Sequence, residues 1–199
     1  MKIIQSIPNI ITVGRLFFTI VILALTAANT PGRNLSLWDV TCALFIVAMI
    51  TDVIDGYIAR SYGSETQLGR ILDPLVDKLL ICGLFAVFAD GQFSETGVRG
   101  WMTAIIVGRE ILVTSLRGMG EAKGVNFAAL FSGKLKLCVQ TVTLIAIFIY
   151  AGHFQGIKWA RILRDAAIWM TLIETVWSAW AYLVLAKRTL LGVSQKNNR

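Results

Sequence analysis

The stretch Asp52-Val-Ile-Asp55-Gly56-Tyr-Ile-Ala59-Arg60, continued after a polar link by Gly69-Arg-Ile-Leu-Asp73-Pro-Leu-Val-Asp77, decides how this sequence folds. Its first two aspartates are three residues apart and its last two are four apart, so each pair lies on one face of a helix. Long apolar runs flank the stretch, and four carboxylates in such surroundings are tolerated only beside a positive charge. Carboxylate oxygens in this number are typical ligands of Mg²⁺ or Mn²⁺, whereas zinc would take His or Cys. The stretch therefore predicts a divalent-metal site inside a membrane protein.

The composition supports the membrane assignment. The chain has 199 residues, of which 56% are hydrophobic and 16% charged, and its mean hydropathy is +0.68. Soluble domains carry about 25% charged residues, and a helix needs about 20 apolar residues to cross a bilayer. We predict an all-α, polytopic membrane protein with six transmembrane helices in a single domain, 1–199. The predicted spans are residues 10–28, 38–58, 68–89, 101–116, 135–154 and 166–185.

The two ends of the chain are predicted to lie outside these spans. Residues 1–9 carry Lys2 and a break at Pro8-Asn9, which favours a short interfacial helix. Residues 186–199 form a polar cytoplasmic tail. A secretory signal peptide is the alternative for the first span, because Lys2 precedes an apolar run that reaches small residues near Ala27. Arg15 within that run and the spans that follow favour a retained helix.

The charge distribution predicts orientation and partners. The formal net charge is +7. The side that holds both termini and the aspartates carries more Lys and Arg than the opposite loops, whose basic residues are Arg33, Arg99, Lys158, Arg161 and Arg164. By the positive-inside rule, the aspartates face the cytoplasm, here from a bacterial inner membrane. Without an aromatic–basic platform nucleic acid is excluded, and anionic lipid headgroups and a phosphorylated substrate are the expected partners.

Several other polar or reactive residues are interpreted structurally. The three cysteines lie in apolar runs and are odd in number, so no disulfide framework is expected. His153 is interpreted as an interfacial residue and Glu174 as a buried protonated or hydrogen-bonded acid. Packing and interface roles are expected for Trp169, Trp177 and Trp180.

The aspartate stretch fits the pattern D-x-x-D-G-x-x-A-R-x(8)-G-x-x-x-D-x-x-x-D at all eight fixed positions. It resembles the signature of the CDP-alcohol phosphatidyltransferase family. Shorter motifs are similar to the branch of that family that uses glycerol 3-phosphate as acceptor: Ile7-Pro8-Asn9 with Thr12 and Arg15, Arg109-Glu110-Ile, and Gly133-Lys134-Leu-Lys136 with Gln140. Leu137 departs from that branch, which often has Thr there.

The resemblance implies a six-helix membrane fold, a homodimer and a cavity that faces the cytoplasm. It implies that CDP-diacylglycerol donates its phosphatidyl group to sn-glycerol 3-phosphate, giving phosphatidylglycerol phosphate and CMP in phospholipid biosynthesis. Within the family, cardiolipin synthesis with phosphatidylglycerol as acceptor remains an alternative. Outside it, an intramembrane prenyltransferase or a divalent-cation transporter is less well supported, because one contiguous stretch holds all four aspartates and the outer halves of the spans are apolar.

The aspartates have distinct expected roles. Asp52, Asp55 and Asp73 can ligate a cation that also holds the pyrophosphate of the donor. Asp77 can contact a second Mg²⁺ or Mn²⁺ ion and take the proton of the acceptor hydroxyl, a role as base that rests mainly on the resemblance. Because none of the eight fixed positions of the motif is Ser, Cys or His, direct displacement is expected rather than a covalent enzyme intermediate.

The remaining candidate residues would contact the two substrates. Gly56, Ala59 and Gly69 are small enough to admit the nucleotide and pyrophosphate close to the backbone. Arg60 and Thr66 are polar and could bind them. Helix packing is the alternative for the two glycines. Arg109 and Lys134 are the candidates for binding the acceptor phosphate. Arg109 could instead pair with Glu110, and Lys134 could simply lie at the cytoplasmic interface.

Overall fold

The structure is a computed structural model that describes the backbone of residues 2–62, 67–122 and 132–190 and the side chains of residues 14–52, 75–76, 78–120 and 136–187. Within these ranges it is all-helical, which confirms the predicted class. Over these residues it consists of six α-helices and of the 3₁₀ helix η1 (Gly91–Thr96), which lies between the third and the fourth α-helix. The α-helices are α1 (Lys2–Ala28), α2 (Leu35–Tyr62), α3 (Gln67–Phe88), α4 (Gly100–Ala122), α5 (Ser132–His153) and α6 (Lys158–Leu190).

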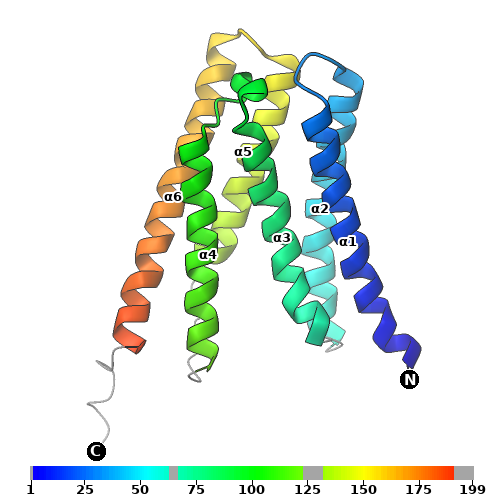
Figure 1. Ribbon diagram of the computed structural model, residues 1–199, viewed down its shortest axis with the longest axis vertical. Coiled ribbons are helices and arrows are strands. Elements are labelled where there is room, and N and C mark those ends of the chain that lie inside the picture. The colour runs from blue at the N-terminus through cyan, green and yellow to red at the C-terminus, as the bar shows by residue number, and fades with distance from the viewer. Residues whose placement is uncertain (1, 63–66, 123–131, 191–199) are drawn as a thin grey trace, which may run out of the picture.

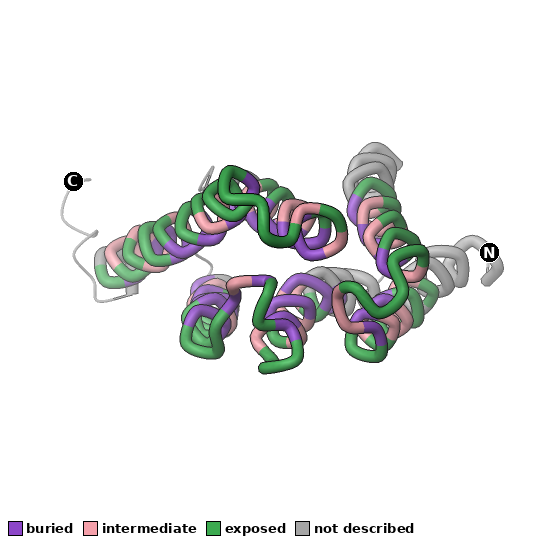
Figure 2. The backbone as a smooth tube through the Cα atoms, turned by 90° about the horizontal axis from the view of Figure 1, so that it is seen from above, coloured by how far each residue is buried: buried purple, intermediate pink, exposed green. Residues whose placement is uncertain are grey.

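The helices form two layers of three. One layer is α6, α5 and α2 and the other is α4, α3 and α1, and each helix packs against its counterpart in the other layer (Figure 2). In this order α2 contacts α1 and α5, while α3 contacts α1, α4 and α5. Over the described residues, the backbones of α2 and α3 do not come close to each other, although the rings of Trp38 on α2 and Phe88 on α3 are in contact. The two helices that carry the aspartates are therefore diagonal neighbours in the bundle.

The helices converge at one end of the molecule and diverge toward the other (Figure 1). The diverging end, at the bottom of Figure 1, holds both termini, the end of α2 and the start of α3. The motif aspartates belong to these parts of α2 and α3. Their backbone thus lies at the end of the bundle where the termini lie, as the sequence predicts.

An aromatic cluster closes the converging end. It is defined by Trp38 of α2, Phe45, Phe88 of α3, Phe93 of η1 and Phe148 of α5, all at most 2% exposed. The Trp38 and Phe148 ring centroids are 5.1 Å apart, and Trp38 Nε1 donates a hydrogen bond to the Phe148 carbonyl oxygen at 2.8 Å. Aromatic pairs at such distances stabilise a core beyond their buried area. This cluster joins α2, α3, α5 and η1.

The loop between α3 and α4 is held at the same end by polar contacts. Thr96 Oγ1 donates to the carbonyl oxygens of Phe88 and Phe93 at 2.8 and 2.7 Å. Arg164 Nη1 of α6 donates to the Glu95 carbonyl oxygen at 2.5 Å. Gly97 has a φ of +76°, and a Cβ there would lie 2.9 Å from Arg164 Cζ. Glycine is thus required at this position both for its left-handed backbone and for the close approach of the guanidinium.

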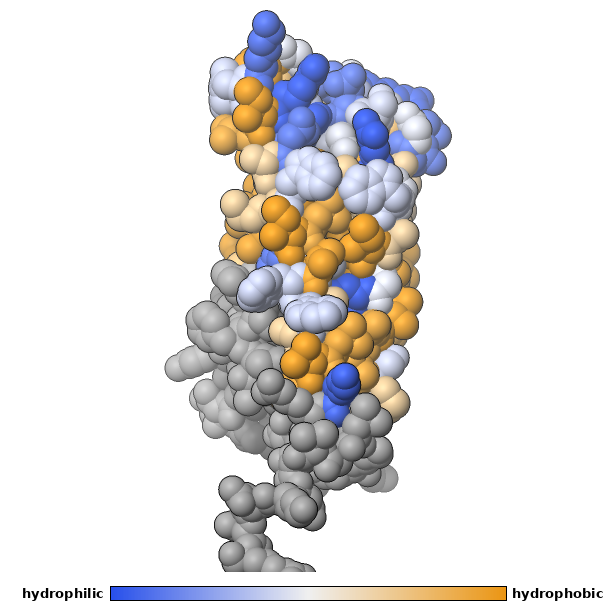
Figure 3. All heavy atoms as spheres, turned by 90° about the vertical axis from the view of Figure 1, so that its left-hand side faces the viewer, coloured by the Kyte–Doolittle hydropathy of each residue, from blue (hydrophilic) through white to orange (hydrophobic). Residues whose placement is uncertain are grey.

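Three helices are long and apolar enough to span a membrane, through the segments Leu35–Asp52, Lys136–His153 and Lys158–Lys187. Shorter apolar stretches are Gly14–Ala28 and Lys78–Phe88. The side of the molecule that α6 occupies carries an apolar band below a hydrophilic upper end (Figure 3). Trp169, Trp177 and Trp180 are all more than half exposed, and Trp169 contacts Trp101 at 6.1 Å between ring centroids. These features support a membrane protein; six spans remain a prediction.

Some predicted boundaries were wrong. The predicted break at Pro8-Asn9 is absent, and α1 is continuous from Lys2 to Ala28. The described part of residues 1–9 therefore belongs to α1 and forms no separate interfacial helix. A proline in a helix removes one i→i−4 hydrogen bond, and α1 accommodates Pro8 while the residues on both sides stay helical. The basic segment 158–164, predicted as a loop, is the first part of α6. The helix also continues past residue 185 to Leu190, so the predicted tail 186–199 begins as helix.

Candidate functional site

Asp52 is the motif aspartate whose side chain the structure describes. Arg15 Nη1 of α1 donates to Asp52 Oδ1 at 2.5 Å, and Arg15 Nη2 reaches the Thr51 carbonyl oxygen at 3.4 Å. The two side chains are 17% and 20% exposed. Partial burial strengthens the attraction between the charges. Helix α1 therefore supplies a positive charge to the first carboxylate of the motif.

The other motif residues are placed by their backbone alone. Asp55, Gly56, Ala59 and Arg60 belong to α2, and Gly69, Asp73 and Asp77 belong to α3. Their side chains, and all of Thr66, lie outside the described residues. Among the side chains that are described, no three metal-ligating residues lie together. The metal and nucleotide contacts predicted for the motif thus stay predictions.

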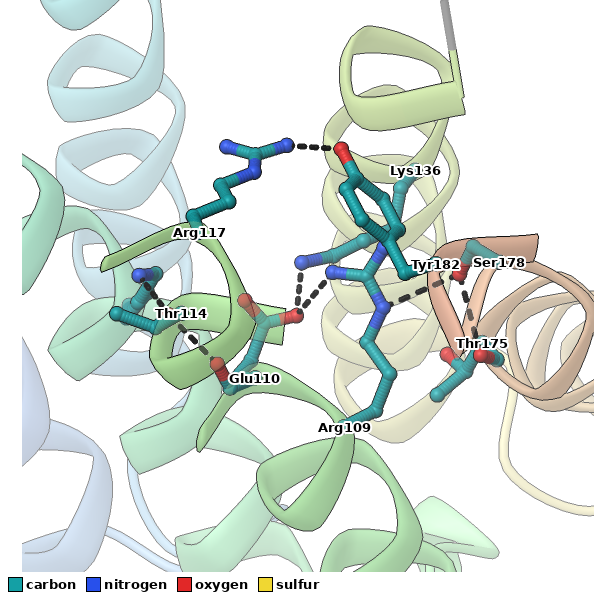
Figure 4. Close-up of polar contacts among 9 residues, drawn as sticks. Arg109, Glu110, Thr114, Arg117, Lys136, Thr175, Ser178 and Tyr182 are labelled. Atoms are coloured by element: carbon teal, nitrogen blue, oxygen red, sulfur yellow. Dashed lines mark hydrogen bonds and ion pairs between the residues drawn. The ribbon is translucent and has the colours of Figure 1, made fainter. Parts of the chain in front are cut away.

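A second group of polar side chains lies between α4, α5 and α6, and we call it the polar cluster (Figure 4). It consists of Arg109, Glu110, Lys136, Ser178 and Tyr182. Glu110 Oε1 accepts from Arg109 Nη1 at 3.3 Å and also from Lys136 Nζ. Arg109 Nε donates to Ser178 Oγ at 3.1 Å, so the guanidinium joins α4 to α6. These bonds connect three helices through charged groups.

The charged members of the cluster are buried. Arg109, Glu110 and Lys136 are 6%, 7% and 8% exposed. Buried ions are costly unless their hydrogen-bonding groups are paired. Arg109 Nη2 and Gln140 Nε2, one turn along α5 from Lys136, find no hydrogen-bond partner among the described residues. The cluster thus has donors left over for an acceptor that the described residues do not supply.

Arg117 and Tyr182 extend the cluster along α4 and α6. Arg117 Nη2 donates to the Tyr182 hydroxyl oxygen. The Tyr182 ring lies between two guanidinium groups, with Arg117 Cζ at 5.1 Å and Arg109 Cζ at 5.7 Å from its centroid. Cation–π contacts at these distances are attractive. Tyr182 therefore holds both arginines near the cluster through its ring.

A hydrogen-bonded chain links this cluster to the aspartate motif. Lys78, the residue after Asp77, donates from Nζ to Thr114 Oγ1 at 2.5 Å. Thr114 Oγ1 in turn donates to the Glu110 carbonyl oxygen at 2.6 Å. Thr114 thus connects Lys78, the neighbour of Asp77 on α3, to the backbone of Glu110 in the polar cluster.

The sequence anticipated part of this arrangement. Arg109 makes the ion pair with Glu110 that was the alternative to acceptor binding, and its predicted contact with the acceptor phosphate stays a prediction. The Lys134 side chain lies outside the described residues. Lys136, which the sequence offered only as part of the motif in residues 133–140, is buried in the cluster. Glu174, predicted as a buried or hydrogen-bonded acid, is partly buried, and its Oε2 is unpaired among the described atoms.

A helical periodicity could have revealed the residues that were missed. Glu174, Ser178 and Tyr182 recur every four residues, so they lie on one face of α6. Lys136 and Gln140 have the same spacing on α5. Polar residues at this spacing in otherwise apolar helices indicate a shared polar seam.

Comparison with known proteins agrees with the motif. The family model for CDP-alcohol phosphatidyltransferase matches residues 5–190. A relative from Bacillus subtilis (strain 168), CDP-diacylglycerol–glycerol-3-phosphate 3-phosphatidyltransferase, is 30% identical over 89% of this chain and 93% of its own. Proteins with the same name from Rickettsia felis and Haemophilus influenzae are 30% and 28% identical, each over 94% of this chain and over 99% and 96% of their own. Because the family model covers nearly the whole sequence and the signature is complete, the chain belongs to the CDP-alcohol phosphatidyltransferase family.

Proposed function

We propose that this protein transfers the phosphatidyl group of CDP-diacylglycerol to sn-glycerol 3-phosphate, forming phosphatidylglycerol phosphate and releasing CMP. The names of the relatives from Bacillus, Rickettsia and Haemophilus support this activity. These relatives are matched along almost their entire length.

The observation that carries the choice of acceptor is the surplus of positive charge in and around the polar cluster, which Lys78 and Thr114 link to α3. Arg109, Lys136 and Arg117 bring three cations to the polar cluster, against the carboxylates of Glu110 and Glu174. Arg109 Nη2 also has an unused donor. A phosphate monoester is a compact dianion that accepts several charge-assisted hydrogen bonds. The phosphate of glycerol 3-phosphate matches both the charge and the free donors.

The aspartates would hold the divalent ions. The donor set consists of carboxylate oxygens alone, which suits Mg²⁺ or Mn²⁺, and we propose two ions bound by Asp52, Asp55, Asp73 and Asp77. When bound, such ions supply positive charge that offsets the pyrophosphate and the departing CMP. Arg15 already pairs with Asp52, so this carboxylate is oriented by α1.

The reaction is proposed as a direct displacement. The acceptor hydroxyl oxygen attacks the phosphorus that bears diacylglycerol, the bond from this phosphorus to the CMP oxygen breaks, and Asp77 takes the hydroxyl proton. Gly56, Ala59 and Gly69 would leave room for the cytidine and pyrophosphate, and Arg60 and Thr66 would bind them. Lys134 would add a second lysine to the acceptor phosphate.

All six helices are proposed to span the membrane. Each has at least 22 residues, and about 20 suffice to cross a bilayer. Helix α4 is interrupted by charges, but it buries Arg109 and Glu110 and exposes Ile111 and Met119, which could face lipid. The aspartates would then face the cytoplasm of a bacterial inner membrane. A single domain and a homodimer remain part of the proposal.

The test is CMP release by the purified protein in lipid nanodiscs with CDP-diacylglycerol and one acceptor at a time. The acceptors are glycerol 3-phosphate, phosphatidylglycerol, inositol phosphate and serine. We expect glycerol 3-phosphate to be used and EDTA to stop the release. Use of phosphatidylglycerol in its place would make the protein a cardiolipin synthase. Metal flux into proteoliposomes without CMP release would instead favour a transporter.

A further inference from the structure

We propose that Glu110 is a positioning residue, which orients the Arg109 guanidinium and the Lys136 ammonium for the phosphate of the acceptor. This inference rests on the proposed function, because it assumes that the polar cluster binds that phosphate. Glu110 itself would not contact the substrate's reacting atoms. It would act through the two cations that share its carboxylate.

The geometry of the shared oxygen supports this role. Glu110 Oε1 accepts from both Arg109 Nη1 and Lys136 Nζ, which belong to different helices. An arginine and a lysine each have several rotatable bonds, and fixing them in one geometry costs conformational entropy. One buried carboxylate that bonds both groups fixes them together. The entropy is then lost on folding and not on binding of the acceptor.

The bonds leave suitable donors free. Arg109 is fixed at two points, with Nε bonded to Ser178 and Nη1 bonded to Glu110. Its third nitrogen, Nη2, is buried and has no partner among the described residues. Lys136 has three N–H donors, of which the Glu110 contact uses one. The carboxylate thus holds both cations and still allows each to donate to a phosphate oxygen.

Glu110 is itself held in place. Its backbone carbonyl accepts from Thr114, which in turn accepts from Lys78 of α3. Its side chain is 8% exposed, so water competes little for the carboxylate. The residues linked to it by hydrogen bonds come from four helices: Lys78 of α3, Arg109 and Thr114 of α4, Lys136 of α5 and, through Arg109, Ser178 of α6. The acid therefore lies where the element with Asp77 meets the three helices of the cluster.

A purely electrostatic role predicts the opposite effect of mutation. If Glu110 only reduced the positive charge of the cluster, its neutralisation would strengthen binding of a phosphate dianion. If it positions the two cations, neutralisation would weaken binding, because the neutral amide oxygen of glutamine holds the arginine and the lysine less firmly than a charged carboxylate does. The sign of the change therefore distinguishes the two roles.

The experiment compares wild type, Glu110→Gln and Glu110→Asp in nanodiscs. We expect Glu110→Gln to raise KM for glycerol 3-phosphate about tenfold or more, with little change in KM for CDP-diacylglycerol. Glu110→Asp keeps the charge and should recover part of the loss. Thr143→Val is the matched control, because it removes buried bonds between α5 and α6 to Thr171 and Ala167 outside the cluster. It should lower thermal stability without altering either KM.

Binding of inorganic phosphate, measured by calorimetry without donor, tests Glu110 independently of turnover. Wild type should bind phosphate more tightly than Glu110→Gln, with Glu110→Asp between them. Equal or tighter binding by Glu110→Gln, or an unchanged KM, would overturn the positioning role while the proposed function stands. Failure of wild type to use glycerol 3-phosphate would refute the proposed function, and the phosphate measurement would still decide the role of Glu110.

Discussion

The two ends of the helix bundle differ in what they bury. At the converging end, aromatic rings of α2, α3, α5 and η1 fill the interior, and the buried Trp38 N–H has a carbonyl partner. Toward the diverging end, the polar cluster buries an arginine, a glutamate and a lysine, and some of its donors are unpaired. At the converging end, the aromatic rings are packed together and the Trp38 N–H is satisfied within the protein. The diverging end leaves donors without a partner among the described residues.

This difference separates stability from activity. Apolar packing with satisfied hydrogen bonds stabilises the folded state, whereas buried charges with free donors reduce stability and are typical of functional sites. Mutations at the converging end should therefore unfold the protein, and mutations at the diverging end should impair the reaction. The predictions below test that division.

The largest effect is expected for Asp77→Asn. Loss of a general base reduces turnover by about 10²–10⁴-fold, and asparagine keeps the size of the side chain. CMP release should fall by this factor, while thermal unfolding and binding of CDP-diacylglycerol change little. An active variant would remove Asp77 as the base.

Trp38→Ala should have the largest effect on stability. The side chain is 1% exposed and contacts three other aromatic rings, so its truncation should cost about 3–5 kcal/mol of unfolding free energy. The measurement is denaturant unfolding in detergent, with Trp177→Ala, 73% exposed, as control. If instead KM for the acceptor rose at unchanged stability, the two ends would not be separable.

Arg109→Ala should impair binding of the acceptor more than binding of the donor. Loss of charge-assisted bonds to phosphate should raise KM for glycerol 3-phosphate by roughly 10–100-fold. Steady-state CMP release at varied concentrations of each substrate gives both values of KM. A larger change for CDP-diacylglycerol would place Arg109 at the donor.

Gly97→Ala should have the smallest effect, a loss of about 1–2 kcal/mol in unfolding free energy, because alanine is strained at positive φ. The added Cβ would also displace the Arg164 guanidinium. Thermal unfolding should show the loss with KM for both substrates unchanged. Gly91→Ala, where no atom lies within 4 Å of the new Cβ, should be close to neutral.

Much of the fold followed from local pattern. Apolar runs of helical length predicted the helices, and the predicted third span, 68–89, nearly coincides with α3 at Gln67–Phe88. The predicted helix boundaries were wrong where the local preference of the residues differed from the structure that they adopt. Pro8 is accommodated inside α1, and the basic start of α6 is helical, with Arg164 bonded to the Glu95 carbonyl oxygen of η1.

The site was predictable where a motif is contiguous and much less so where it is assembled from distant segments. The four aspartates lie in one stretch of the chain, so their spacing is visible in the sequence. This spacing identified the family and the proposed chemistry. Ser178 and Tyr182 carry no such signature, because their significance arises from contact with Arg109 on another helix.

The sequence by itself determined the helical class, the membrane character and the aspartate motif, since periodicity, hydropathy and spacing are properties of local segments. Tertiary structure alone decided that α2 and α3 are diagonal neighbours, that Arg15 pairs with Asp52, and that one carboxylate joins Arg109 to Lys136. Such contacts depend on how helices pack against one another. The packing is set by side chains far apart in the sequence, which no local pattern brings together.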